Sequence, residues 1–249
     1  MPRLLLTDAY WSKLQIILQQ FSIYIKLNTR TFIEAVLYRI RTGIPWRDLP
    51  PDFGKWNSTY KRFNQWSIKG IWHCIFKQLV DDPDFEFIFT DASYIKAHQH
   101  SMGAASNHSE AIGVSVGGNT TKIHMLVDAM GLPIQFIVTG GNIAEVTQAA
   151  ELILSVKPAQ YTVADRGYDK EQLREDIKNH GSESVIPRKK NSLKGNDDID
   201  FAIYKDRHLV ENVFARLKHF RGFSSRYDKL ERNFTSVVSI LCAFLWLPM

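Results

Sequence analysis

The sequence predicts an α/β protein with an all-helical N-terminal region, and three observations lead to this prediction. Apolar residues recur at helical spacing from about residue 7 to residue 80. From Phe85 onward, short runs of β-branched and aromatic residues end at turn-forming residues and alternate with helical segments. The acidic turn Asp81–Phe85 separates the two patterns. We therefore expect a helical domain at residues 1–82 and an α/β domain at residues 83–249.

The composition describes a basic chain that favours an anionic partner. The 249 residues carry a formal net charge of +5, with a pI of about 9.1. Cys74 and Cys242 show no metal-ligand or disulfide spacing, which indicates a reducing compartment and two packing residues. The N-terminus becomes polar too soon for a secretory signal, and the apolar run Val237–Met249 is too short to span a bilayer. We expect a cytoplasmic protein without a membrane partner.

The N-terminal region reads as four helices. Residue pairs able to cap a helix precede or begin three of them: Thr7–Asp8, Asn28–Thr29 and Ser58–Thr59. The prolines of Gly43–Pro51 require a defined turn between the second helix and the third. Lys55, Lys61 and Arg62 lie among aromatic residues, which is typical of helix-turn-helix DNA readers. A plain helical bundle that braces the core explains the same pattern, so both interpretations stay open.

The second region alternates strands and helices. Strands are expected at Phe85–Thr90, Gly113–Val116, Lys122–Asp128, Leu132–Thr139, Tyr161–Ala164 and Ser184–Ile186, and helices at Asn142–Val156 and Tyr168–Asn179. Met130–Gly131 is expected to form a hairpin turn. Pro187–Ile199 is an exposed basic loop, and an apolar helix follows from about Phe234 to the C-terminus.

The segment Tyr204–Arg221 is predicted to be one helix with two distinct faces. Its apolar stripe recurs at i, i+3, i+4 and i+7: Val210, Val213, Phe214 and Leu217. A second stripe places Tyr204, Arg207, Glu211 and Lys218 close to one line, because the steps between them are three, four and seven residues. An amphipathic helix with ordinary charge pairs explains this stripe equally well.

Two predicted strands end in aspartate, at Asp91 and at Asp165. Residues just past the carboxyl ends of strands line the functional crevice of an α/β sheet, and Glu211 would reach it from the helix. Three carboxylates repel one another unless a cation joins them, and Mg²⁺ prefers such oxygen ligands. Asp128 is the main rival for the second acid, but we favour Asp165, because Asp128 begins a hairpin turn where acids are common.

Other polar residues receive simpler interpretations. Asp169 is expected to cap a helix. His98 and His100 form an HxH pair without the further ligands that a tetrahedral zinc site needs, so we expect a polar loop.

Several motifs together resemble those of DDE transposases, most closely the insertion-sequence family five. They are IFTDAS around Asp91, VADRGYD around Asp165 and the Tyr204, Arg207, Glu211 and Lys218 pattern. The turn GIPWRDLP at Gly43–Pro50 and the run TKIHMLVD at Thr121–Asp128 extend the resemblance over nearly the whole chain.

The resemblance implies an RNase H-like mixed sheet flanked by helices. It implies Asp91, Asp165 and Glu211 as catalytic residues and ligands of Mg²⁺, with Mn²⁺ as a substitute. The implied partners are double-stranded DNA, both the terminal inverted repeats of a transposon and its target, and a second copy of the chain in the synaptic complex at the bacterial nucleoid. We expect DNA contacts from Tyr204, Arg207, Lys218, Arg188, Lys189, Lys190 and Arg221.

Two alternatives to a full transposase stay open at this stage. One is a transposase-derived DNA-binding regulator that has lost catalysis. The other is an RNase H-like nuclease that cuts DNA without joining strands.

Overall fold

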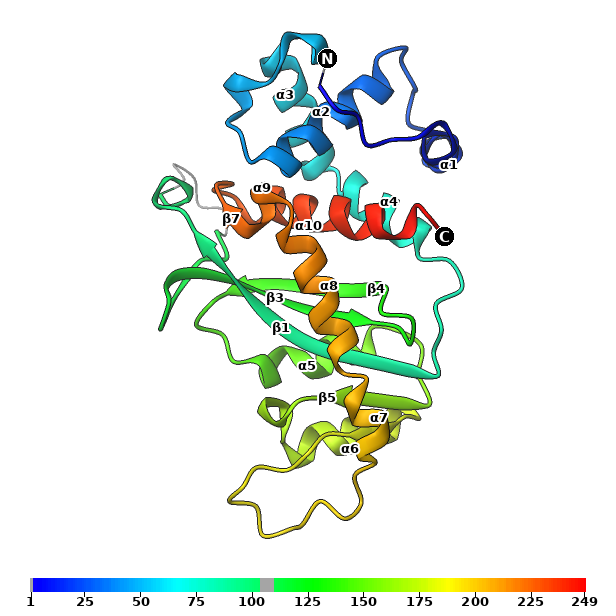
Figure 1. Cartoon of the computed structure of the whole chain (residues 1–249), viewed down its shortest axis with the longest axis vertical. Coiled ribbons are helices and arrows are strands. Elements are labelled where there is room, and N and C mark those ends of the chain that lie inside the picture. The colour runs from blue at the N-terminus through cyan, green and yellow to red at the C-terminus, as the bar shows by residue number, and fades with distance from the viewer. Residues whose placement is uncertain (1, 104–109) are drawn as a thin grey trace. The chain divides into compact units, whose positions relative to one another are not determined.

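The computed structural model describes residues 2–103 and 110–249, and they form two compact units (Figure 1). The first unit gathers Met1–Asp81, Ala97–Glu110 and Leu217–Met249, and the second gathers Asp82–Lys96 and Ala111–Arg216. The C-terminal helix, which the sequence-based division placed in the α/β domain, thus packs within the first unit. The boundary at residue 82 between two functional domains stays a prediction.

The first unit is built almost entirely of helices. Its elements are α1 (Asp8–Gln20), α2 (Thr29–Thr42), η1 (Trp46–Asp48), η2 (Pro51–Phe53), α3 (Trp56–Ile68), α4 (Ile71–Leu79), η3 (Gln99–Ser101), α9 (Arg221–Ser224), β7 (Ser225–Arg226) and α10 (Glu231–Trp246). Thr7 caps α1 as predicted, because its hydroxyl accepts a hydrogen bond from the Tyr10 N–H at 3.2 Å. The expected start of the third helix at Ser58 was wrong: α3 begins two residues earlier.

Apolar and aromatic side chains form the core of the first unit. Helix α10 packs along α4 with nearly every residue buried, which explains its apolar sequence. The rings of Phe32, Trp66 and Trp72 meet at centroid distances of 4.8 to 5.8 Å. None of the helices in the described ranges is long and apolar enough to cross a membrane.

The second unit is a mixed sheet with helices. Its elements are β1 (Phe87–Ala97, up to Lys96 in this unit), β2 (Gly113–Ser115), β3 (Gly118–Val127), β4 (Pro133–Gly140), α5 (Glu145–Leu154), β5 (Tyr161–Ala164), η4 (Arg166–Tyr168), α6 (Glu171–His180), β6 (Glu183–Val185), α7 (Phe201–Lys205) and α8 (His208–Lys218, up to Arg216 in this unit). Gly131 sits in the predicted hairpin turn before β4 with a φ of +74°, which favours glycine.

The strand order confirms the α/β prediction. Strands β4, β3 and β1 pair antiparallel, whereas β1, β5 and β6 pair parallel, so the order is β4-β3-β1-β5-β6, with β2 beside β3. This is the strand arrangement of an RNase H-like sheet, as expected. Strands β3 and β5 are almost fully buried.

Two differences from the predicted boundaries affect the residues of the site. The strand expected to end at Thr90 continues to Ala97, because β1 keeps pairing with β3 beyond its last partner on β5. The helix expected over Tyr204–Arg221 is broken into α7 and α8. The backbone N–H groups of four residues bond to carbonyls three residues earlier rather than four, which tightens the chain at the break: Asp206, Arg207, Leu209 and Val210.

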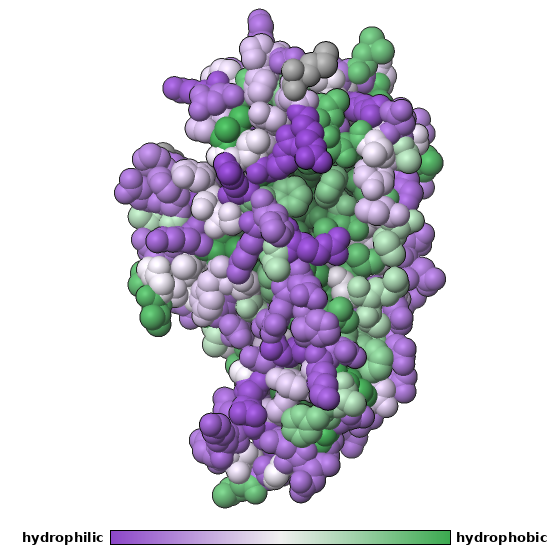
Figure 2. Space-filling view, in the orientation of Figure 1, coloured by the Kyte–Doolittle hydropathy of each residue, from purple (hydrophilic) through white to green (hydrophobic). Residues whose placement is uncertain are grey.

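Helix α8 has the two faces that its sequence predicts. Val210, Val213 and Phe214 are buried, while most of the residues between them are exposed. Figure 2 shows hydrophilic side chains over much of the surface along this helix.

Candidate active site

Asp91 lies in β1, and Asp165 directly follows the neighbouring parallel strand β5 and begins η4. The last parallel pair joins Thr90 of β1 to Ala164 of β5, and each aspartate is the next residue. Their carboxylates are fixed by the backbone: the Ala92 N–H donates to Asp91 Oδ1 at 2.8 Å, and the Gly167 N–H donates to Asp165 Oδ1 at 2.7 Å. The sheet therefore holds two acids side by side, although Asp91 sits within its strand and not after it.

A third acid at this edge of the sheet is Glu145, in the first turn of α5. A β-carbon placed on Gly167 would lie 2.9 Å from Asp165 Oδ1 and 3.5 Å from Glu145 Oε2, so both carboxylates border this glycine. Lys122 Nζ, which is buried, lies 3.4 Å from Glu145 Oε1. The sequence reasoning missed Glu145. The feature of the sequence that could have indicated Glu145 is an acid in the first turn of a helix that follows a strand and a turn.

Arg207 connects the helix to the sheet. Its guanidinium lies 3.6 Å from Asp91 Oδ2 and forms an ion pair and hydrogen bond with Glu211, one helical turn further on. The Tyr204 ring lies 5.9 Å from the same guanidinium. Three of the four residues of the predicted polar stripe thus lie together beside Asp91, despite the break in the helix.

Lys218 does not join this cluster through any contact among residues 2–103 and 110–249. It lies on α8 seven residues beyond Glu211, which is about 10 Å along a helix. Its side chain is exposed.

The surroundings of Asp91 change its pKa. Burial raises the pKa of Asp91 to about 6, and the negative charges of Asp165 and Glu145 add to the rise. The Ala92 N–H and the Arg207 guanidinium oppose it. Burial also raises the pKa of the nearby Tyr168 hydroxyl, and the same carboxylates contribute. The site therefore concentrates more negative charge than its protein cations balance.

The donor set fits a hard divalent cation, but the side chains are not gathered around one point. Within the described parts of the chain, no group of three or more His, Cys, Asp or Glu residues is arranged to hold a metal ion. The candidate ligands Asp91, Asp165 and Glu211 offer carboxylate oxygens, the type that Mg²⁺ prefers. Arg207 instead stands between Asp91 and Glu211, so closing the three around a cation requires this arginine to release Glu211.

The other acids considered for the site, Asp128 and Asp169, form hydrogen bonds with other parts of the chain. Asp128 Oδ1 accepts hydrogen bonds from the N–H groups of Leu132 at 2.8 Å and Met130 at 3.1 Å, which makes it the turn acid that the sequence suggested. Asp169 accepts from Arg174 at 2.8 Å and from the Lys189 N–H at 2.7 Å.

The histidine pair lies at the start of η3, directly after β1. The His98 ring stacks on Tyr227 at 4.3 Å, and its Nδ1 accepts from the His100 N–H. It belongs to no candidate metal cluster among the residues that the structure describes.

The predicted DNA contacts outside the helix differ in their surroundings. Arg188 is bound to Asp198, with one contact at 2.7 Å, and to the Gly195 carbonyl at 2.9 Å, so it organises its own loop. The side chains of Lys189, Lys190 and Arg221 are exposed.

The strand order and the acids at its parallel edge are those expected of the DDE class. Comparison with known families agrees: residues 6–76 match the family described as "Putative transposase of IS4/5 family", and residues 82–246 match the family described as "Transposase DDE domain". The second match spans more than half of the chain, so the protein belongs to the transposase DDE domain family.

Individual relatives come from mobile elements. A protein of Brucella ovis described as "Putative transposase for insertion sequence element IS6501" is 33% identical over 128 residues, covering 51% of this chain and 98% of that protein. A Burkholderia cepacia protein described as "Putative transposase for insertion sequence element IS402" is 32% identical over 120 residues, covering 44% and 54%. A piggyBac transposase synaptic complex with hairpin DNA shares 11% identity and a TM-score of 0.44, covering 75% and 50%, a likeness too distant to define the site.

Proposed function

We propose that this protein is a transposase that cuts DNA at the ends of an insertion sequence in a divalent-metal-dependent reaction and joins the freed ends to target DNA. The observation that carries the proposal is that Asp91 and Asp165 each follow the last pair of the parallel strands β1 and β5, with Glu211 linked to Asp91 through Arg207. The family membership supports the same reaction class. The relatives described as insertion-sequence transposases support the choice of substrate.

Asp91, Asp165 and Glu211 are the proposed ligands of Mg²⁺ or Mn²⁺. When bound, such a cation activates the attacking oxygen and stabilises the leaving oxygen at a phosphodiester. Burial and the neighbouring acids raise the pKa of Asp91 to about 6, and a bound cation would lower it again by favouring the carboxylate form. Glu145, paired with Lys122, adds negative potential to the same edge.

Arg207 has two roles in this proposal. It offsets the charges of Asp91 and Glu211 in the protein alone, and it becomes a phosphate contact once Glu211 turns to the cation. Tyr204, Lys218, Arg188, Lys189, Lys190 and Arg221 are the remaining proposed DNA contacts. Since an element has two ends, we propose that two copies of the chain meet in the synaptic complex at the bacterial nucleoid.

The test is strand cleavage on labelled DNA that carries the ends of the element. We expect nicking at the end with Mg²⁺ or Mn²⁺, none with EDTA, and none with Glu211→Gln. Glu175→Gln removes an exposed acid of α6 outside the site and is the matched control, which should cleave normally. Tight binding without nicking would favour the DNA-binding regulator. Nicking without insertion into added target DNA would favour the nuclease that does not join strands.

A further inference from the structure

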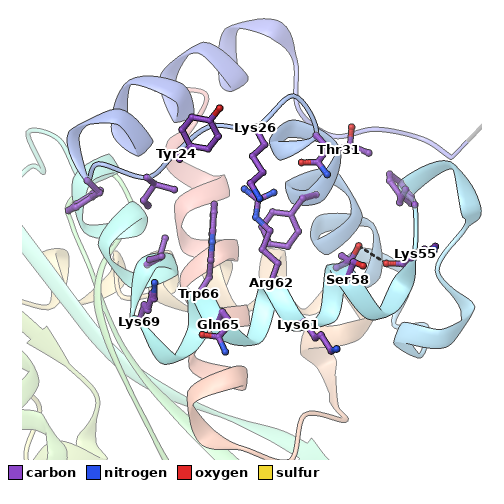
Figure 3. A pocket seen from close by; sticks show the side chains of 18 of the residues that line it. Tyr24, Lys26, Thr31, Lys55, Ser58, Lys61, Arg62, Gln65, Trp66 and Lys69 are labelled. Atoms are coloured by element: carbon purple, nitrogen blue, oxygen red, sulfur yellow. Dashed lines mark hydrogen bonds between the residues drawn. The ribbon is translucent and has the colours of Figure 1, made fainter.

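A pocket in the first unit is lined by residues between Phe21 and Cys74. It has a volume of about 1070 Å³ and is bordered by the loop after α1, by α2 and by α3 (Figure 3). Its cationic lining residues are Lys26, Lys55, Lys61, Arg62 and Lys69. No aspartate or glutamate contributes to the lining. The pocket therefore has the charge of an anion site.

Arg62 is held in place by its neighbours. Its guanidinium lies 4.4 Å from the Phe32 ring centroid and 5.1 Å from that of Trp66, and its Nη2 donates to Thr29 Oγ1 at 2.9 Å. A guanidinium has five N–H donors in one plane. Within residues 2–103 and 110–249, the Thr29 hydroxyl is the one acceptor found for them. The aromatic rings thus hold the Arg62 guanidinium in place, and its remaining N–H donors are available to a ligand.

No ion pair is found for Arg62 among residues 2–103 and 110–249. Burial lowers its pKa, and no carboxylate acts in the opposite direction. Withdrawing a cation from water costs free energy unless an anion offsets the loss. Figure 3 shows the side chains of Lys26 and Arg62 reaching the same part of the pocket from opposite walls. Both cations therefore line one pocket to which no acidic residue of the described chain contributes.

We propose that this pocket binds a phosphodiester of the DNA backbone, with Arg62 as a two-pronged donor and Lys26 as a second cation. Arginine forks match phosphate oxygens in geometry as well as in charge. Tyr24 is 80% exposed at the pocket and offers an aromatic face beside the cations, a combination common in nucleic-acid sites. The proposal rests on the proposed function for the choice of DNA, and it assigns a binding role to helices that the sequence left undecided.

The test compares two double variants of the full chain, each lacking two positive charges. Lys26→Gln/Arg62→Gln alters the pocket, and Lys157→Gln/Lys178→Gln removes two exposed lysines of the second unit. Binding to fluorescent element-end duplex is measured over a series of KCl concentrations. We expect the pocket variant to bind about tenfold more weakly at about 0.1 M salt, and its slope of log affinity against log salt to fall by about two. The control variant should resemble the wild type. Equal losses in the two variants would overturn the proposal.

Two further variants show whether a loss of DNA binding comes from the pocket's charge or from a change in folding. If the circular dichroism of the Arg62 variant departs from wild type, Lys26→Gln/Lys69→Gln repeats the test without touching the aromatic contacts, with the same criterion. Arg62→Lys keeps the charge but loses the fork, so it should bind DNA more weakly than wild type and more tightly than the double variant.

A measurement with inorganic phosphate distinguishes a site for free phosphate from a site for the phosphodiester of DNA. If phosphate protects the wild type against heat through Arg62 while the pocket variant binds DNA normally, the site serves free phosphate and the proposal fails. The assay reads binding alone. A protein that binds ends but does not nick them would therefore break the proposed function without affecting the pocket comparison.

Discussion

The two charged regions of the molecule treat their charges in opposite ways. In the second unit the acids at the sheet edge are partly offset by the protein itself: Arg207 faces Asp91 and Glu211, and Lys122 faces Glu145. In the first unit the cations of the pocket face no acid in its lining. These acids of the second unit are therefore paired with cations of the protein itself, whereas the cations of the pocket are available to an anionic partner.

The difference between the two regions predicts that variants of the acids and variants of the pocket will affect different steps, DNA cleavage and DNA binding. Acids held by backbone N–H groups on strands and helices are positioned precisely, which metal chemistry requires. Cations on long side chains adapt to a backbone of variable shape and contribute mainly through charge. Changes in the acid cluster should therefore alter cleavage at constant binding, and changes in the pocket should alter binding.

The largest effect is expected for Asp91→Asn. The amide keeps the shape but cannot become a charged ligand, so cleavage of element-end DNA should fall by at least about a thousandfold, or about 4 kcal/mol. Binding of the same duplex should change less than about twofold, as judged by fluorescence anisotropy. A variant that cleaves like the wild type would remove Asp91 from the catalytic site.

A smaller effect on cleavage is expected for Glu145→Gln, because this acid borders Asp165 and shapes the potential without being a proposed ligand. Groups in this position typically change activity or metal affinity by about 10- to 100-fold. The cleavage rate should fall within that range, and raising Mn²⁺ should recover part of it. A rate that does not respond to the metal concentration would argue for a purely structural role.

Arg207→Gln should affect stability in a metal-dependent way. Without the guanidinium, Asp91 and Glu211 lose their shared counter-ion, so we expect the melting temperature in EDTA to drop by about 3 °C, as for a loss of about 1 kcal/mol in a chain of this size. Mg²⁺ should restore more of the variant's stability than it adds to the wild type. Arg207→Lys keeps the charge and is the control. Equal Mg²⁺ effects in all three proteins would contradict the counter-ion role.

The last effect concerns His124, a base that the sheet keeps neutral, and it leaves stability at neutral pH unchanged. Burial, assisted by the charge of Lys122, lowers its pKa to about 4, below the ordinary value of 6.5. The unfolded chain therefore takes up a proton first as the pH falls, so this contribution to stability is complete above about pH 6.5 and is lost towards pH 4. Between pH 7 and pH 5 the wild type should lose about 1–2 kcal/mol more than His124→Asn in urea unfolding. Identical losses would exclude His124 as the cause.

Much of this arrangement could be predicted from the sequence. Alternating patterns and turn residues were sufficient for the α/β class, and the strand-end aspartates and the Arg207–Glu211 spacing pointed to one site. The end of β1 could not be predicted, because pairing with β3, a distant segment, extends it past Asp91. The break before α8 depends on local backbone bonding that hydrophobic periodicity does not report.

Glu145 and the pocket were missed for another reason. Glu145 becomes part of the acid cluster only when α5 is placed against the loop that carries Gly167. Lys26 and Arg62 come from segments far apart in sequence, and nothing in either segment indicates that they meet. The spatial convergence of charges was therefore information that only the fold supplied.

The most direct test of the central claim compares two aspartates with different surroundings. Asp165→Asn changes the proposed ligand at the parallel edge, whereas Asp128→Asn changes an acid that binds the N–H groups of its own turn. Nicking of element-end DNA in Mg²⁺ is measured per folded molecule. The account predicts loss of nicking in Asp165→Asn and retention in Asp128→Asn. Retention in Asp165→Asn together with loss in Asp128→Asn would contradict it.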